Sequence, residues 1–386
     1  MVINMSSTKK KKFPWKSVGM IALFLGCSFG VGWFIGSVLD PMLEELPPEK
    51  FLAGLAGVYV FSILFYFFQI VVHEAGHLLF GLLTGYEFSS FRIGSFMWVK
   101  LEGKIRLKRF SLSGTGGQCL MAPPDPVDGK VPYVLYNFGG CIANLVVSVI
   151  PLILVLLFWQ PTYWYFMVVL WAAIGLFLSL TNGIPMKMQG MPNDGHNALS
   201  LGKKPEALRA FWLQMKIMEQ ISLGKRLRDL PEEWFVPADA EGMKNSMIAT
   251  IAVLACNRLL DAGKYEQAAE LMEHLIKQES GMVEIHKHML NADRIYCEMV
   301  SQNRPEILKE LYTDELKKFL KAMKKSPSVF RTEYLYAKYV EKDEKKATVA
   351  MNGFEKVAKT YPYPQEVAGE RELISYAENH FAKQSL

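Results

Sequence analysis

The chain has 386 residues, of which 51% are hydrophobic and 21% are charged. It is too apolar for an ordinary soluble protein and too charged for a pure membrane bundle, so we expect a membrane part and a soluble part. The net charge of +5 is small for this length and excludes a strongly basic nucleic-acid-binding chain, so we expect no nucleic-acid partner.

The N-terminus predicts a basic segment, residues 1–17, followed by a first membrane span and an external loop, residues 18–50. Residues 18–39 carry no charge and follow a cluster of lysines, which is long enough for a transmembrane helix. A signal peptide also begins this way, but its apolar core is shorter and ends in a small-residue cleavage site, so a retained span fits better. The loop 40–49 holds four acids and no base, which indicates an external loop.

Two further charge-free runs predict the remaining spans. Residues 51–72 form the first of these runs, and the apolar pattern continues to about Leu83. Residues 131–186 form the second, which is long enough for two helices with a break at Gln160-Pro161. The sequence therefore predicts about four spans. Lysines and arginines gather near the N-terminus, between the second and third spans and after the fourth, so both termini are predicted to be cytoplasmic.

The basic segment between the second and third spans predicts a β-hairpin. Residues 91–101 are rich in aromatic and β-branched side chains, Glu102-Gly103 is a turn signal, and apolar residues roughly alternate over 105–112. The following "GTGGQCLMAPP" is rich in Gly and Pro and is predicted to be irregular. The hairpin is either a plain surface feature or an edge strand that pairs with an extended substrate.

"HEAGH" at the end of the second apolar run predicts a metal site. Residues four apart lie on one face of a helix, so His73 and His77 can both point at one metal ion. Neutral imidazole is a good zinc ligand, and Glu74 can act as general base toward water that the metal activates. The plainer alternative is a charged helix end at the lipid interface, although ionisable residues there usually have a function.

A catalytic zinc site needs a third protein ligand. The first acid after residue 129 is Asp194, just beyond the fourth span and on the same predicted side as His77. His196 is the competing ligand. Asn-Asp-Gly is also strong turn chemistry, and a turn can present a ligand.

The chain resembles the site-2 protease family of intramembrane zinc metalloproteases. The resemblance covers about residues 51–200 and rests on four features in order: HEAGH at the end of a span, a hairpin followed by "GTGGQC", "GGCIAN" in the next span, and "NGIP" followed by "DG" after the last span.

The resemblance implies a catalytic Glu74 and one zinc ion per chain held by His73, His77 and Asp194. It implies that Asn144 lies near the active site and holds substrate backbone or the oxyanion; a structural role for this buried amide is the alternative. Two departures stand out. Cys141 occupies the usual place of a proline, and the gap before Asp194 is longer than usual.

Residues 201–386 predict a cytoplasmic helical domain. Residues 247–278 predict two helices with a turn at Ala262-Gly263. The Gly-Lys-Tyr-x-x-Ala pattern at 263–268 resembles a tetratricopeptide repeat, and an ordinary helical bundle is the alternative. The five cysteines are scattered without a CxxC pair, so we expect reduced thiols.

The expected architecture is mainly α: a polytopic membrane helix bundle with a cytoplasmic β-hairpin segment, with residues 51–200 as the metalloprotease core, followed by the helical domain 201–386. The expected function is hydrolysis of peptide bonds in a single-pass membrane protein, a signal-peptide remnant or a peptide precursor, near the cytoplasmic face of the membrane. The chain itself is expected to be a multi-pass protein of a bacterial cell membrane. The expected partners are this substrate, membrane lipid and a protein that binds the helical domain. The alternative is an inactive scaffold or receptor that acts through its helical domain.

Overall fold

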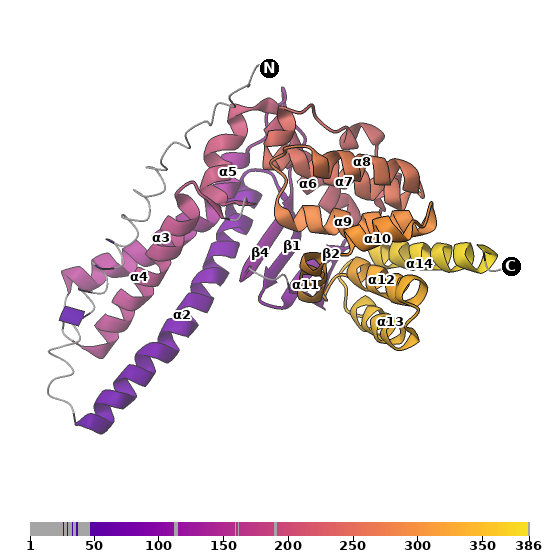
Figure 1. Cartoon of the computed structure of the whole chain (residues 1–386). Coiled ribbons are helices and arrows are strands. Elements are labelled where there is room, and N and C mark those ends of the chain that lie inside the picture. Colours follow the sequence, from indigo (N-terminus) through magenta and orange to yellow (C-terminus); the bar gives the residue numbers. More distant parts are fainter. Residues whose placement is uncertain are drawn as a thin grey trace, which may run out of the picture. The chain divides into compact units, whose positions relative to one another are not determined.

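A computed structural model describes residues 47–111, 115–158, 160, 162–188 and 191–384, together with five isolated positions between 26 and 37 (Figure 1). The predicted basic segment 1–17 lies outside the described residues. So does the predicted first span 18–39, apart from those isolated positions.

Among the described residues, three helices are long and apolar enough to cross a membrane. They are α2 (Pro48–Leu83), α3 (Tyr133–Leu157) and α4 (Tyr163–Gly183). Helix α2 ends where the apolar pattern predicts, and the predicted break at Gln160-Pro161 falls between α3 and α4. The count of four spans and their orientation remain predictions.

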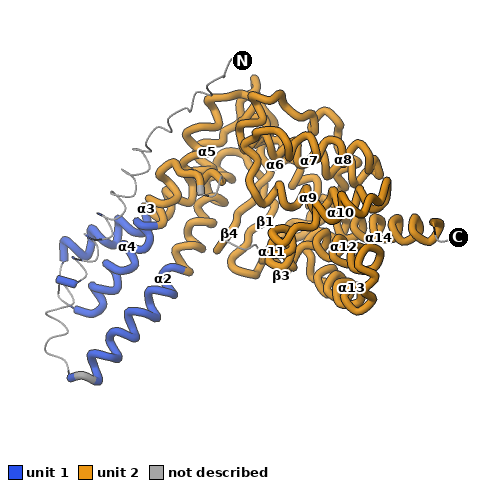
Figure 2. Tube along the Cα trace, viewed as in Figure 1, with its two compact units in different colours: residues 1–66, 146–177 blue, residues 67–145, 178–386 orange. Residues whose placement is uncertain are grey.

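The chain divides into two compact units, and the first comprises residues 1–66 and 146–177 (Figure 2). Its described part contains the first half of α2, the second half of α3 and most of α4. Phe166, Met167 and Leu170 of α4 are buried against Val58, Phe61 and Phe65 of α2. Trp171 donates its indole N–H to the Val147 carbonyl oxygen at 3.0 Å, which satisfies this polar group within an apolar helix pair.

The second unit, residues 67–145 and 178–386, contains a four-stranded antiparallel sheet in the order β3-β2-β1-β4. Its strands are β1 (Glu87–Ile93), β2 (Phe96–Leu101), β3 (Lys104–Arg109) and β4 (Gly117–Ala122). The predicted hairpin is β2–β3, with a first strand that begins at Phe96, since residues 91–93 of the predicted strand belong to β1. Its turn lies at Glu102-Gly103, where both residues have positive φ, as a two-residue hairpin turn requires.

The sheet corrects one expectation from the sequence. The Gly-rich and Pro-rich stretch after the hairpin was predicted to be irregular, but it contains β4, which pairs with β1. Strand β4 is held in place from α3, because the Tyr136 hydroxyl donates to the Cys119 carbonyl oxygen at 2.8 Å. Non-local pairing and packing outweigh the weak strand propensity of glycine here. On its other side β4 has no partner strand among the described residues, so it is a sheet edge.

A short hairpin and a short helix follow α4, and a helical domain completes the second unit. The hairpin is β5 (Lys187–Met188) with β6 (Met191–Pro192). The helices after it are α5 (Asp194–Ser200), α6 (Pro205–Ser222), α7 (Ser246–Asp261), α8 (Tyr265–Lys277), α9 (Glu284–Val300), α10 (Pro305–Leu311), α11 (Asp314–Ala322), α12 (Pro327–Leu335), α13 (Glu344–Ala358) and α14 (Pro364–Gln384). A π-helical turn, Tyr336–Glu341, continues α12.

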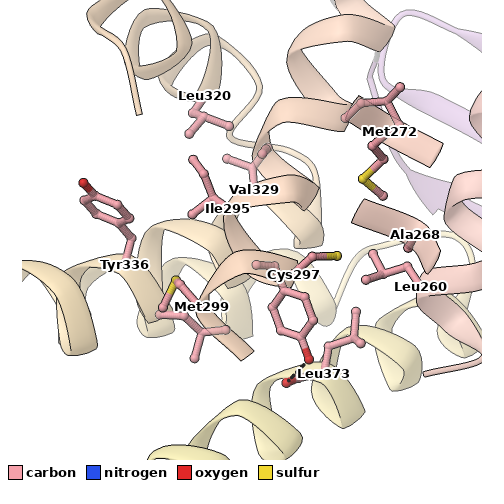
Figure 3. Close-up of a cluster of buried hydrophobic side chains, with 14 of the residues drawn as sticks. Leu260, Ala268, Met272, Ile295, Cys297, Met299, Leu320, Val329, Tyr336 and Leu373 are labelled. Carbon is pink, nitrogen blue, oxygen red and sulfur yellow. Dashed lines mark hydrogen bonds between the residues drawn. The ribbon is translucent and has the colours of Figure 1, made fainter. Parts of the chain in front are cut away.

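The helical domain has one large apolar core, formed by α7 to α14. Figure 3 shows part of it, including Met272 of α8, Ile295 of α9 and Val329 of α12. The Tyr296 hydroxyl donates to the Leu373 carbonyl oxygen at 2.9 Å. The predicted turn between α7 and α8 is present, with Gly263 at positive φ. The tetratricopeptide resemblance stays a prediction. The four cysteines within the described residues are free and buried.

Candidate metal centre and active site

The C-terminal half of α2 carries the two histidines on one face. His73 and His77 are both buried, and their Nε2 atoms lie 3.2 Å apart. This is the geometry that the i, i+4 spacing predicts. Gly140 on α3 allows the imidazole to lie there, because a Cβ at this position would come within 2.6 Å of the His73 ring. The "GG" of the third apolar run is therefore explained by close packing against α2.

Asp194 reaches the histidines from the first turn of α5. The β5–β6 hairpin lies in the gap between Pro185 and Asp194. Its ends close on each other, since the Asn193 amide donates to the Met186 carbonyl oxygen at 3.0 Å. The hairpin therefore brings the end of α4 and the start of α5 close together.

Asn193 fixes α5 to the end of α4 through its side chain. Its Oδ1 accepts from the His196 amide at 3.0 Å, which caps α5, and from the Met186 amide at 3.0 Å. Its Nδ2 donates to the carbonyl oxygens of Thr181 and Ile184 at 2.9 and 2.7 Å. The Asn-Asp-Gly sequence thus both forms a turn and presents a candidate ligand.

Three potential ligand atoms converge at one point. Asp194 Oδ2 lies 3.0 Å from His73 Nε2 and 3.5 Å from His77 Nε2. A tetrahedral zinc ion with bonds of about 2.0 to 2.1 Å places its ligand atoms about 3.3 Å apart. The three separations in this cluster, 3.0, 3.5 and 3.2 Å, bracket that value. The cluster therefore fits a zinc ion in both donor type and spacing.

The hydrogen bonds at the Nδ1 atoms of the two histidines also favour a cation bound at their Nε2 atoms. His77 Nδ1 lies 2.8 Å from the Tyr136 carbonyl oxygen, and His73 Nδ1 lies 2.7 Å from Asn144 Oδ1. A carbonyl oxygen only accepts, so His77 Nδ1 must donate. If His73 Nδ1 also donates, both neutral rings present a lone pair at Nε2. Two lone pairs and a carboxylate oxygen would then face one another, an arrangement that a bound cation stabilises.

Glu74 lies beside the edge strand. The residue is buried, and a Cβ added at Gly117 of β4 would come within 2.6 Å of its Oε1 atom. The absence of a side chain at Gly117 thus lets the carboxylate approach the β4 backbone. Glu74 thus lies between the group of potential metal ligands and the edge strand β4. From there its carboxylate could act as a general base on a peptide bound along that edge.

A buried arginine braces the start of β4. Arg92 of β1 is 1% exposed, and it donates to the carbonyl oxygens of Gly94 at 2.8 Å and Gly117 at 3.2 Å. It also bonds to Thr115. These contacts hold Thr115 and Gly117 against β1.

The structure distinguishes Asp194 from His196 as candidates for the third ligand. Asp194 belongs to the one group of potential metal ligands found among the described residues, and His196 does not. The Nδ1 atom of His196 lies 2.8 Å from the Ser200 hydroxyl.

The sequence did not predict that Gln69 and Asn193 lie next to the site. Gln69 lies in what reads as an uninterrupted apolar run, and its contact with Asn144 joins residues 75 positions apart. Asn193 reads only as turn chemistry. A polar residue in a charge-free span was the available signal for Gln69, because a buried amide needs hydrogen-bond partners.

Comparison with models of known protein families shows which family the chain belongs to. The model of Peptidase family M50 matches residues 60–365, well over half of the chain. The chain belongs to peptidase family M50. The family match confirms the resemblance to the site-2 proteases and includes both the HEAGH helix and Asp194. Comparisons with curated proteins and with solved structures gave no match. Members of family M50 are zinc-dependent metalloproteases, and the apolar helices of this chain indicate a membrane protein.

Proposed function

We propose that this chain is an active intramembrane zinc metalloprotease with His73, His77 and Asp194 as zinc ligands and Glu74 as catalytic base. The observation that supports it most is the convergence of three ligand atoms at tetrahedral spacing, from two buried histidines and a partly buried aspartate. When bound there, zinc supplies Lewis acidity, which acidifies water and polarises a carbonyl group. Glu74 takes a proton from the attacking water and passes it to the leaving amine nitrogen as the C–N bond breaks.

The proposed substrate is a single-pass membrane protein, a signal-peptide remnant or a peptide precursor, cut near the cytoplasmic face in regulated intramembrane proteolysis. A transmembrane helix satisfies its own backbone hydrogen bonds and must unwind locally before it is cut. The unpaired side of β4 offers backbone donors and acceptors to such an unwound segment, next to Glu74.

The proposed topology is a multi-pass bacterial cell-membrane protein with both termini in the cytoplasm. The basic segment 100–109 and the helical domain would then share the cytoplasmic side with the HEAGH end of α2. The helical domain would bind a partner protein or regulate substrate access. Treating cells with a membrane-impermeant lysine reagent tests this topology, since labelling of the helical domain in intact cells contradicts it.

Quantitative membrane proteomics of cells that carry either the wild type or Glu74→Gln tests the protease proposal. The substitution keeps the side-chain size and removes the base. Accumulation of one or a few single-pass proteins or short membrane peptides in the variant identifies substrates and supports catalysis. Matching proteomes under several growth conditions would contradict it and direct attention to the helical domain as a scaffold.

A further inference from the structure

Two buried amides stand behind His73. Gln69 of α2 and Asn144 of α3 are both 0% exposed. Asn144 Oδ1 lies 2.7 Å from His73 Nδ1, and Asn144 Nδ2 lies 2.8 Å from the Gln69 backbone oxygen and 2.7 Å from Gln69 Oε1. Burying these amides is unfavourable unless their hydrogen bonds are made, and this chain of contacts makes them.

The Gln69 backbone oxygen fixes which way the Asn144 amide faces. A backbone carbonyl can only accept, so the NH₂ group of Asn144 must point toward it. A flipped amide would set the Asn144 oxygen against both the backbone oxygen and Oε1 of Gln69. The remaining atom, Asn144 Oδ1, therefore faces His73, and the orientation follows from the network itself.

This orientation sets the proton on His73. Because Asn144 Oδ1 accepts, His73 Nδ1 must donate, and the neutral ring then has its lone pair on Nε2. Nε2 is the atom that lies 3.0 Å from Asp194 Oδ2 and 3.2 Å from His77 Nε2. We propose that Gln69 and Asn144 are positioning residues that hold His73 in its metal-binding tautomer and orientation, and so strengthen zinc binding. This inference rests on the zinc site of the proposed function.

The same contacts argue against an oxyanion role for Asn144. Its two amide hydrogens are directed at the two oxygens of Gln69, and its own oxygen accepts from His73. No donor is left for a substrate oxygen. A role through His73 uses all of these contacts, whereas oxyanion binding would require breaking at least one.

The two histidines differ in how they are held. His77 Nδ1 donates to a backbone oxygen, that of Tyr136, which no side-chain substitution removes. His73 depends on the side chains of Asn144 and Gln69. Substitutions at these two positions are therefore expected to affect one zinc ligand and leave the other in place.

Zinc affinity of the purified full-length protein, measured by competition with a chelating dye, tests the inference without a substrate. Asn144→Leu is expected to weaken zinc binding about 10-fold to 100-fold, the usual effect of losing such a support. Gln69→Leu keeps the backbone oxygen that orients Asn144 and loses one of its two contacts, so a smaller weakening is expected. Gln69→Glu keeps an acceptor for the Asn144 amide and is expected to stay near the wild type. Asn137→Leu is the matched control. It removes another buried amide of α3, one that bonds only the Tyr133 carbonyl oxygen among the described contacts.

A second measurement needs no variant. Nitrogen-15 spectra of imidazole-labelled, zinc-loaded wild type should show the proton of His73 on Nδ1 and zinc bound at Nε2. An Nε2-protonated His73, or Asn144→Leu that is folded and binds zinc as tightly as the wild type, overturns the inference while leaving the zinc site intact. A wild type without zinc affinity would overturn the proposed zinc site and this inference together.

Discussion

Asp194 Oδ2 lies 3.0 Å from His73 Nε2, although 121 positions separate the two residues in the chain. The end of α4 and the first turn of α5 bring them together. The candidate zinc site therefore depends on how closely α5 packs against α4, and substitutions at that corner test this dependence.

Gly195→Ala is expected to weaken zinc binding and lower stability, because a Cβ at this position would overlap the Gly183 carbonyl oxygen. Overpacking of this kind costs about 1 to 3 kcal/mol. Gly183→Ala at the same corner is the control, since its Cβ would lie 3.6 Å from Cys141 Sγ, an ordinary contact. Zinc content and thermal unfolding of the two purified variants decide the matter. Equal losses of zinc and of thermal stability in the two variants would contradict the explanation by close packing at Gly195.

Asn193→Ala removes the cap of α5 and the side-chain bonds to Thr181 and Ile184. Loss of a helix cap alone costs about 1 kcal/mol. Because the freed segment carries Asp194, we expect weaker zinc binding together with a lower unfolding temperature. Asn193→Ser retains a capping oxygen and loses the two donated bonds, so its effect should be intermediate. Unchanged zinc affinity in Asn193→Ala would show that Asp194 is held by other contacts.

Arg331→Met is expected to destabilise the helical domain strongly. Arg331 is 0% exposed and pairs with Asp293 and with Glu370, the latter at 3.0 Å. Removing it leaves two acids in a largely buried site, which costs about 3 to 5 kcal/mol. Arg371→Met breaks the exposed pair with Glu355 and should cost about 1 kcal/mol or less. Chemical denaturation of the full-length variants measures both effects. Similar losses of unfolding free energy in the two variants would contradict the distinction between a buried and an exposed ion pair.

Stability is expected to fall as pH rises toward neutrality because of Glu366. Burial raises the pKa of Glu366 from 4.5 to about 7, and the hydrogen bond with Tyr361 offsets this only in part. Between these two values the folded state binds more protons than the unfolded state, so this stabilisation is complete below pH 4.5 and lost through pH 7. Glu366→Gln should reduce the slope of the unfolding free energy against pH over this range, and the slope that remains is expected from Glu370, whose pKa burial also raises to about 7. A slope in Glu366→Gln identical to that of the wild type would contradict the assignment.

Local patterns in the sequence predict the elements that local interactions determine. The apolar run and HEAGH give α2 and the face that carries both histidines, and Glu102-Gly103 gives the β2–β3 turn. Strand β4 was not predicted, because its partner β1 lies about two dozen residues away and glycine is a poor strand former. Gln69 was missed for the same kind of reason, since its contact with Asn144 depends on how α2 and α3 pack together.

The most direct test of the metalloprotease proposal is peptide-bond cleavage by the purified protein in lipid vesicles, using a substrate that accumulates in Glu74→Gln cells. Wild type with zinc is expected to cut it, and Glu74→Gln is expected to bind zinc with the same affinity and to leave the substrate intact. Cleavage at an equal rate by wild type and Glu74→Gln, or by wild type after complete removal of zinc, would contradict the account.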